Sequence, residues 1–561
     1  MTRLAGRELL ALDVETDGLD VHRNRVILLT VGDDSLQLVV DCRRCSLEPL
    51  APLLSGPVTK VLHHGAFDLA MLRNLGVRVE NVRDTMLNEQ ILENGRGEGP
   101  FSLAALSRKY LKVELPKELR TSFSAEGEIS PAQLEYARRD VLATFQILLE
   151  QAPRLAQDQL ADTAVLEGEA VPAFADLHFD GVCLDRERWA ALVENNRQHQ
   201  QQIKAELDRH FAPVVSSDLF GNPIINYESE AELRPALEKL CRVRLRELDK
   251  NALAALKHPV GKLLVEYREA GKIVSTYGQS FLERIHPRTG RIHADFHQIG
   301  APTGRVSCSD PNLQNIPRGS EFRRCFCAPP GKRMITADYS GCELRILAQS
   351  SDDDAFISAF RRGADLHALV ATEIFGRTVT KTLNPELRNR AKAINFGLAY
   401  GMGAAGLAQV CAMSVEAAEE LLQRYFRSFP RVYQYLEDSA AQALRQGWCA
   451  TIGGRKLWIK EPSGPEERAA ALRVAKNMPI QGTNADMLKA AMAAIRRRFL
   501  DENLSARMVN CVHDEILAEA DEDSVWEAAE VVKEEMIRAG ERYITKVPVE
   551  VEVLVGDWWQ K

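Results

Sequence analysis

Short apolar runs alternate with helical patterns over roughly the first 150 residues. The runs Leu9–Leu12, Val26–Leu29 and Leu36–Val40 have the length and composition typical of strands, and helical patterns follow from Leu47 onward. This alternation predicts an α/β domain at the start of the chain.

The pattern between Gln151 and about Arg284 is almost wholly helical. Long amphipathic stretches surround Trp189–Phe211 and Val260–Ile285, and the turn-rich segment Ser216–Asn226 separates them. We expect an extended helical arm in the middle of the chain.

Strands and helices mix again from Ile292 onward. Strand patterns lie near Met334–Ala337, Met508–Val512 and Ile516–Glu519, and helical patterns surround Ala355, Arg388, Ala417 and Asp486. No internal repeat is present. A chain of 561 residues, at roughly 150 residues per domain, therefore predicts a mixed α/β protein of three to four units.

The composition is that of an ordinary globular protein, with 45% hydrophobic and 27% charged residues. The chain has 71 basic and 79 acidic residues, a net charge of −8, so any site for a polyanion must be local. Because no apolar run is long enough to span a bilayer and no signal peptide is evident, we expect no membrane partner and a cytoplasmic location.

The eleven cysteines are scattered along the chain. The close pairs Cys42/Cys45 and Cys325/Cys327 have no matching pair or histidine cluster at zinc-finger spacing. We therefore expect reduced thiols rather than structural zinc.

Four acids in the first domain have the spacing of a metal site. Asp13 and Glu15 are two residues apart at the end of a strand, so they project from one face, and Asp68 opens a helical stretch. Asp140 follows Tyr136 by four residues on a helix. Any one of these acids alone could be a solvated strand or helix end, but together they suit two hard cations that activate water against a phosphodiester.

These residues form a recognisable motif set: Asp13-x-Glu15-x-x-x-Leu19, Phe67-Asp68 and Tyr136-x-x-x-Asp140. The set resembles that of the DEDDy-type 3′–5′ exonucleases on the RNase H-like fold. The resemblance implies that the four acids hold two Mg²⁺ or Mn²⁺ ions, that Tyr136 positions the attacking water and that Leu19 wedges the terminal base. One departure is His64, where proofreading relatives usually carry asparagine.

A second set of acids lies in the last 270 residues or so. Asp338 ends the apolar strand Met334–Ala337 just before a helix, where we expect its carboxylate to be exposed. Val512-His513-Asp514-Glu515 lies between two strand patterns, which predicts a tight hairpin. Asp338 and Asp514 could again hold two metals.

Two cations and two aromatic residues recur every four residues on one helical segment: Arg388, Lys392, Phe396 and Tyr400. Steps of four residues advance about 40° around a helix, so the side chains form one stripe. Such a stripe could bind a nucleoside triphosphate, or could be a helix with solvated cations and buried aromatic rings.

Several motifs of this half occur together and in one order: Thr303-Gly304-Arg305-Val306-Ser307, Asp310-Pro311-Asn312-Leu313-Gln314-Asn315-Ile316-Pro317, Arg388-x-x-x-Lys392-x-x-x-Phe396-Gly397-x-x-Tyr400-Gly401, Gln481-Gly482-Thr483 and His513-Asp514-Glu515. Residues from about 160 to 561 thereby resemble the family A DNA polymerases, the DNA polymerase I type. The chain has no GxxxxGK[ST] phosphate loop, which disfavours a helicase or other NTPase.

The polymerase resemblance implies a role for each matched residue. Asp338 and Asp514 would ligate two Mg²⁺ ions, for which Mn²⁺ can substitute, with help from the Tyr339 carbonyl and with Glu515 as a further candidate ligand. Arg388, Lys392 and His367 would hold the triphosphate, and Lys392 would also donate a proton to the leaving group. Phe396 would pack on the sugar and base of the nucleotide, and Tyr400 would cap the template slot. Glu343 together with Tyr400 would block a 2′-hydroxyl.

The resemblance also implies contacts with primer–template DNA. The minor-groove edge of the primer end would be read by Arg305, Asn477, Gln481 and His513, and the strand backbones would be lined by Asn312, Gln314 and Asn315. Because every correct pair offers acceptors in the minor groove, such a test is independent of sequence.

The implied architecture is an RNase H-like exonuclease domain over residues 1–152, followed by a right-hand polymerase domain over residues 153–561. Within the latter we expect a largely helical thumb at about 160–290, palm segments at about 291–350 and 470–561, and largely helical fingers at about 351–469. The expected partners are primer–template DNA and deoxynucleoside triphosphates, and we expect a monomer, with a processivity or replisome factor as an optional partner.

Two departures limit the resemblance. Arg244–Lys250 stands where the family's thumb tip commonly has a Lys-, Ser- and Thr-rich loop, so the grip on duplex would be weak or come from a partner. No 5′-nuclease domain precedes the exonuclease motifs, so we do not expect this chain alone to excise RNA primers.

The function predicted from these motifs is template-directed DNA synthesis by nucleotidyl transfer, with 3′–5′ proofreading. Three alternatives fit less well. A nuclease with an inactive polymerase half would need damage at Asp338, Lys392 or Asp514, and those residues are intact. A single-subunit RNA polymerase is disfavoured by the Glu343/Tyr400 sugar gate, and a purely structural protein leaves both acid sets unexplained.

Overall fold

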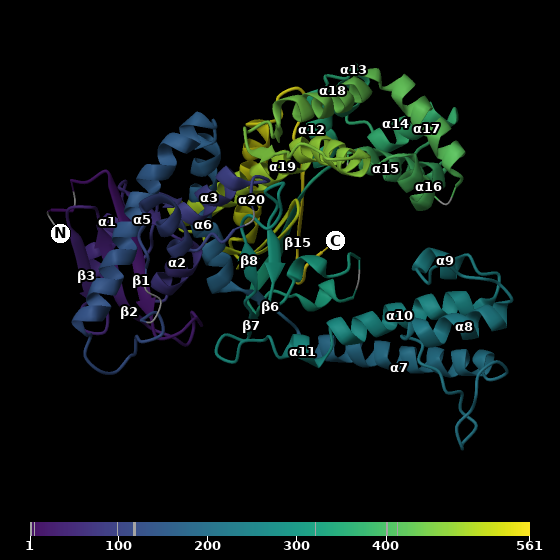
Figure 1. The fold of residues 1–561 in the computed structure, drawn as a ribbon, viewed down its shortest axis with the longest axis horizontal. Coiled ribbons are helices and arrows are strands. Elements are labelled where there is room, and N and C mark those ends of the chain that lie inside the picture. The colour runs from purple at the N-terminus through teal and green to yellow at the C-terminus, as the bar shows by residue number, and fades with distance from the viewer. Residues whose placement is uncertain are drawn as a thin grey trace. The chain divides into compact units, whose positions relative to one another are not determined.

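A computed structural model describes residues 3–4, 6–97, 99–115, 119–319, 321–399, 402–411 and 413–560, without the side chains of residues 396, 398, 399 and 410. The chain forms two compact units (Figure 1). Unit 1 comprises residues 1–181, 293–315 and 328–560, and unit 2 comprises residues 182–292 and 316–327.

Unit 1 begins with a five-stranded sheet in the order β3-β2-β1-β4-β5. Its strands are β1 (Leu9–Thr16), β2 (Val26–Gly32), β3 (Gln37–Asp41), β4 (Thr59–Leu62) and β5 (Val82–Asp84). β1 pairs antiparallel with β2 and parallel with β4, so it is the central strand. The middle of β1 is therefore buried, and its far end carries Asp13 and Glu15.

Helices pack around this sheet: α1 (Ala51–Ser55), α2 (Gly65–Arg73), α3 (Thr85–Glu93), α4 (Leu103–Leu106), α5 (Pro131–Gln157) and α6 (Ala161–Asp180). The helix α5 contacts β1, β2 and β3, and α2 packs against α6. Ser130 begins α5 with a capping box, in which its hydroxyl accepts from the Gln133 backbone N–H. This fixes the register that carries Tyr136 and Asp140 towards the end of β1.

A second sheet in unit 1 has the order β13-β14-β10-β15, with every neighbouring pair antiparallel. Its strands are β10 (Lys332–Tyr339), β13 (Ala506–Val512), β14 (Glu515–Asp521) and β15 (Val551–Gly556). The helices α19 (Pro465–Asp501) and α20 (Val525–Glu541) pack on each other, and α20 contacts β10, β14 and β15. This sheet carries the second set of acids.

Seven helices lie between β10 and α19 in the chain: α12 (Cys342–Ser351), α13 (Asp354–Arg361), α14 (Leu366–Phe375), α15 (Pro385–Ala399), α16 (Ala404–Val410), α17 (Val415–Ser428) and α18 (Pro430–Gln446). The short hairpin of β11 (Trp448–Ala450) and β12 (Lys456–Trp458) follows α18. Another short pair, β8 (Asp295–His297) and β9 (Ser307–Ser309), carries the loop that contains Arg305.

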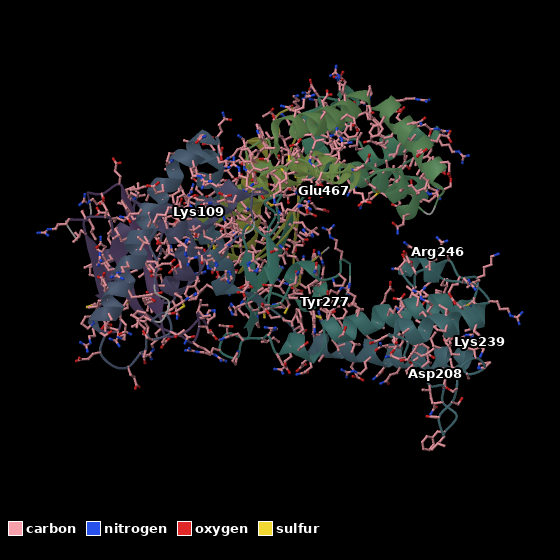
Figure 2. All side chains as sticks on the ribbon, in the orientation of Figure 1. Lys109, Asp208, Lys239, Arg246, Tyr277 and Glu467 are labelled. Atoms are coloured by element: carbon pink, nitrogen blue, oxygen red, sulfur yellow. The ribbon has the colours of Figure 1, made fainter. Side chains whose placement is uncertain are left out.

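Unit 2 is the helical arm predicted from the sequence. It contains α7 (Arg186–Phe211), α8 (Glu230–Cys241), α9 (Lys250–Ala254), α10 (Pro259–Thr276) and α11 (Gln279–Leu282), with β6 (Val182–Cys183) paired to β7 (Arg291–Ile292) at its base. Trp189 anchors this base: its indole stacks on Phe281 with ring centroids 4.4 Å apart and donates to the Tyr277 carbonyl at 2.7 Å. Figure 2 shows Tyr277 at one end of the arm and Asp208, Lys239 and Arg246 towards the other.

The predicted strands and helices are confirmed, and so is the mixed fold class with its two sheets. The domain limits stay predictions. The predicted limit at 152/153 falls inside α5, and α6 belongs to unit 1, whereas the expected thumb begins at about 160. The described residues contain no helix of the length and apolarity that a membrane crossing requires. All eleven cysteines are free thiols.

Candidate active sites

The first candidate site lies where β1, α2 and α5 meet. Ligand atoms of Asp13, Glu15 and Asp140 all lie within 4.8 Å of one another, and they are the only such set of three or more potential metal ligands among the described residues. Asp68 adds a fourth carboxylate: its Oδ1 accepts from the Val14 backbone N–H at 3.2 Å. The sequence alone could not establish this convergence, because the acids come from three separate elements.

Burial and mutual repulsion raise the pKa values of these acids. The pKa of Asp13 lies well above its ordinary value because of burial and then the charges of Asp68, Glu15 and Asp140. The pKa of Glu15 rises to about 8 because of burial, with further contributions from Asp140 and Asp68. Burial also raises the pKa of Asp68 to about 8 and that of Asp140 to about 6.

These acids fit a divalent cation. Only carboxylate oxygens face one another, which hard cations prefer. The Glu15 Oε1 atom is buried without a hydrogen-bond partner among the described residues. A cation here would relieve the repulsion that raises the pKa values, so the residues can hold a metal.

Tyr136 and Arg120 complete this site. Tyr136 hydrogen bonds to Asp140 on the same helix, and its pKa is raised by burial and then by Asp140 and Glu15. The hydroxyl therefore stays protonated. Arg120 lowers the pKa values of Asp13, Glu15 and Asp140, and the sequence interpretation missed it because no motif spacing marks it. Leu19, the expected wedge, is 75% exposed, and His64 begins α2 with a left-handed φ of 65°.

The second candidate site lies on β10 and the β13–β14 hairpin. Asp338 and Glu515 are directly paired across β10 and β14, and the Tyr339 backbone N–H donates to the Asp514 carbonyl at 3.2 Å. His513 and Asp514 form the two-residue turn of the predicted hairpin, and His513 has a φ of 58°. The hairpin thus brings Asp514 beside the end of β10.

The expectation that Asp338 is exposed is wrong. Asp338 is only 9% exposed, because β10 is an inner strand with β14 and β15 on either side. The Cys342 thiol lies near three of the acids: burial raises its pKa, and Asp514, Glu343 and Asp338 raise it further. Asp338 and Asp514 therefore approach the same region. Their carboxylates and the Tyr339 carbonyl offer the oxygen donors that a hard divalent cation prefers, and their sharing of a cation stays a prediction.

Glu515 and Tyr339 have contacts within the protein. The Trp559 indole donates a hydrogen bond to the buried Glu515 carboxylate, and the Tyr339 hydroxyl donates to the Met536 carbonyl at 2.7 Å. Glu515 therefore has a clear structural contact, and its role as a metal ligand stays a prediction. Trp559 was not identified from the sequence because it lies outside every motif.

Arg388 and Lys392 lie on α15, and His367 lies on α14 close enough for their charges to lower its pKa. Arg388 Nε is 2.6 Å from Asp365 Oδ2, and His367 Nδ1 is 3.0 Å from the Asn395 amide nitrogen. Burial, Arg388 and Lys392 together lower the pKa of His367 to about 4, so the imidazole is neutral at pH 7. The first half of α15 therefore carries cationic side chains in a chain with an acidic total.

The aromatic half of the predicted stripe cannot be placed. Tyr400 lies outside the described residues, and so does the side chain of Phe396. The expected pairing of Glu343 with Tyr400 therefore stays a prediction. Glu343 has another contact that the sequence did not suggest: Arg305 Nη2 is 2.5 Å from its Oε1.

The predicted DNA-contacting amides lie on different elements. Asn477 and Gln481 are half-buried on α19, one turn apart, and the buried Asn477 Oδ1 has no hydrogen-bond partner among the described residues. Gln314 donates to the Cys511 carbonyl at 3.2 Å, next to the β13–β14 hairpin. Asn312 accepts from the Gln314 backbone N–H at 3.0 Å, and Asn315 and His513 are exposed.

Comparisons with known proteins agree with this two-site arrangement. The description "DNA polymerase family A" matches residues 193–561, and "3'-5' exonuclease" matches residues 1–155. DNA polymerase I of Pseudomonas aeruginosa is 32% identical over 100% of this chain and 64% of its own length. DNA polymerase I of Chloroflexus aurantiacus is 31% identical over 100% of this chain and 61% of its own length. The chain thus spans somewhat less than two thirds of the length of these relatives.

A thermostable DNA polymerase I of Thermus aquaticus is 40% identical over 69% of this chain and 46% of its own length. One solved structure, described as the POL domain of Pol1 from M. smegmatis in complex with DNA primer-template and dNTP, has a TM-score of 0.85 and 28% identity. The match covers 100% of this chain and 97% of that one.

Proposed function

The chain belongs to DNA polymerase family A, and we propose that it extends a primer 3′ end on a DNA template and shortens mispaired ends at a separate 3′–5′ exonuclease site. The observation that carries this proposal is the presence of two separate carboxylate groups, one at the end of β1 and one at the end of β10. An enzyme with only one of these activities would need only one of the two carboxylate groups. The proposed substrates are primer–template DNA and deoxynucleoside triphosphates, as the ligands of the M. smegmatis structure suggest.

We propose that each site takes two Mg²⁺ ions, for which Mn²⁺ can substitute. Asp338 and Asp514 with the Tyr339 carbonyl would hold them in one site, and the carboxylates of β1, α2 and α5 would hold them in the other. When bound, such ions lower the pKa of a nucleophilic oxygen and neutralise developing charge on phosphate oxygens.

In the polymerase site, the residues of this chain orient and neutralise the triphosphate. Arg388 and Lys392 offer cationic donors to phosphate oxygens, and the neutral His367 offers one ring donor. Lys392 can then deliver a proton to the leaving pyrophosphate. Phe396 would pack on the sugar, Tyr400 would cover the template slot, and Glu343 would exclude a 2′-hydroxyl.

In the exonuclease site, the protonated Tyr136 hydroxyl holds the attacking water through a hydrogen bond. Leu19 is exposed enough to separate a frayed terminal base from its neighbour. At the polymerase site, Arg305, Asn477, Gln481 and His513 would test the minor-groove edge of the primer end. A mispair would lose these contacts, slow extension and give the end time to fray.

Primer extension tests the proposal directly. One recessed 3′ end and one mispaired 3′ end are incubated with Mg²⁺, with and without deoxynucleotides. We expect extension of the matched end with nucleotides, shortening of both ends without them, and removal of the mispair before extension. Shortening without any extension would favour a nuclease whose polymerase half only binds DNA. The monomeric state, a replisome partner and the location in the cell stay predictions.

A further inference from the structure

Four charged side chains are buried together where α6, α19 and the β11–β12 turn meet, and none of them belongs to either carboxylate site. Glu167 and Lys489 are 0% exposed, and Arg455 and Asp486 are each 1% exposed. None of them takes part in the chemistry proposed above. Buried ion pairs seldom stabilise more than apolar packing would, so their presence calls for another reason.

Glu167, Lys489, Arg455 and Asp486 form one ion set, in which each charge is paired within the set. Lys489 Nζ lies 2.6 Å from Glu167 Oε1, and Arg455 Nη2 donates to the same oxygen. Arg455 Nε lies 2.8 Å from Asp486 Oδ1. The two positive and two negative charges balance. Burial alone would raise the pKa of Glu167, but Lys489 and Arg455 outweigh it and hold that pKa below its ordinary value.

Neutral side chains take up the remaining oxygens of the set. The Thr451 hydroxyl donates to Asp486 Oδ2 at 2.8 Å, and the Gln298 amide nitrogen donates to Glu167 Oε2 at 2.5 Å. The Arg455 backbone N–H also donates to the Thr451 hydroxyl at 3.1 Å. The guanidinium of Arg455 is thus held through two of its nitrogens, Nε and Nη2, which a point charge such as lysine cannot reproduce.

The fixed Arg455 side chain lies directly against Gly304. This glycine has a φ of 82°, and a Cβ built on it would lie 2.7 Å from Arg455 Nε and 2.8 Å from Cδ. Helix α19 approaches the preceding residue, because a Cβ on Gly482 would lie 2.9 Å from the Thr303 carbonyl oxygen. The loop is therefore confined by Arg455 and α19, and the next residue is Arg305.

We propose that Arg455 is a positioning residue for the primer end: held by Glu167 and Asp486, it sets the place of Gly304 and thereby of the Arg305 guanidinium. Arg455 itself does not touch DNA. The inference rests on the proposed function, in which Arg305 reads the minor-groove edge of the primer end. The ion set holds Arg455 rigidly, and this matters because a small displacement of Arg305 would break its contact with the primer end.

This role predicts a specific kinetic signature. Arg305 can hydrogen bond an acceptor that a matched end presents and a mispaired end displaces. A displaced Arg305 therefore slows extension of matched ends more than extension of mispaired ends. A merely destabilised protein would lose both activities by the same factor, so the ratio of the two efficiencies distinguishes positioning from folding.

The test compares Arg455→Lys with a matched control, the double variant Glu167→Gln/Lys489→Met. The control removes one opposite pair from the same buried set, and the new amide oxygen can still accept from Arg455. Extension of matched and mispaired primers gives the ratio, and shortening of single-stranded DNA checks the exonuclease site. Circular dichroism reports folding.

We expect Arg455→Lys to lower kcat/KM for the matched end about tenfold and the matched-to-mispaired ratio by a similar factor, with single-strand shortening unchanged. The control should keep the ratio within about twofold of the parent. If Arg455→Lys does not fold, Gly304→Ala replaces it, because it keeps all four charges while its Cβ would lie 2.7 Å from Arg455 Nε, so the loop and the guanidinium must move apart. A parental ratio in the folded variant overturns the inference. Absence of extension by the parent chain overturns the proposed function first, and the inference with it.

Discussion

The guanidinium of Arg305 donates to the carboxylate of Glu343, with Nη2 2.5 Å from Oε1. The two residues come from the β8–β9 loop and the first turn of α12. The glutamate is almost fully buried, whereas the arginine side chain is 22% exposed. A residue proposed to test the primer end is thus tied to one proposed to test the sugar of the incoming nucleotide.

This pairing predicts coupled effects of Arg305→Ala and Glu343→Ala. Each single variant leaves one charge without its partner, so the double variant should lose less stability than the two single losses added. We expect a coupling free energy of about 1 kcal/mol or more, measured by urea unfolding of the parent, both singles and the double. Strictly additive losses would mean that the contact contributes nothing.

Glu343→Ala should also raise the ratio of ribonucleotide to deoxynucleotide incorporation.

Variants at the two carboxylate groups should separate the two activities. Asp13→Ala with Glu15→Ala should lower primer shortening about a hundredfold or more, because it removes two of the carboxylates proposed to hold the metal, while extension persists. Asp514→Ala should do the reverse. Shortening and extension are measured on the same primer–template with each variant. Loss of both activities in either variant would argue against two independent sites.

Asp365 should influence nucleotide binding through Arg388. Asp365 is also the N-cap of α14, where its Oδ1 accepts from the Ala368 backbone N–H at 3.1 Å. Asparagine caps helices equally well, so Asp365→Asn removes the charge but keeps the cap. We expect KM for deoxynucleotides to rise about threefold to tenfold with kcat little changed, since Arg388 loses its orientation before the triphosphate binds. Asp365→Ala, which also removes the cap, serves as the comparison, and an unchanged KM in the asparagine variant would contradict the idea.

The elements of the fold follow closely from local patterns. The strands at Leu9, Val26 and Met334 and the long helices of the arm lie where their patterns predicted them, although these three strands extend beyond the predicted apolar runs. The hairpin at His513 and Asp514 is also a local feature, since two residues separate two strands. The motifs placed the acids on these elements, and the family resemblance then implied that the acids of each site lie close together.

The sequence could not predict which side chains from distant segments contact one another. Asp338 was expected to be exposed because strand ends commonly are, but its strand is flanked on both sides. The contacts of Arg305 with Glu343, and of Arg455 with Glu167, join residues far apart in the chain, and no spacing rule marks them. The same holds for Arg120 beside the first acid set.

The raised pKa values of the exonuclease acids predict how metal-free stability depends on pH. Glu15 has an ordinary pKa of 4.5, which the folded chain raises to about 8 because of burial and then its acidic neighbours. Between these values the unfolded chain has released a proton that the folded chain keeps. The contribution of Glu15 to stability should therefore fall as pH rises from about 4.5 to about 8, and its whole cost is present above that range.

Divalent cation should reverse this trend. At pH 8, Mg²⁺ binds the ionised carboxylates of the folded chain and should raise Tm, whereas at pH 5 the protonated acids bind it poorly and Tm should hardly change. Glu15→Gln removes one of the repelling charges, so the metal-free variant should be more stable than the parent at pH 8 and should gain less from Mg²⁺. Thermal unfolding in EDTA and in Mg²⁺ across this pH range measures all three effects. Glu48→Gln serves as a control, because Glu48 is exposed and lies outside the acid set, and it should follow the parent throughout. The same dependence of Tm on pH in EDTA for the parent and for Glu15→Gln would show that these carboxylates do not repel one another as their spacing requires.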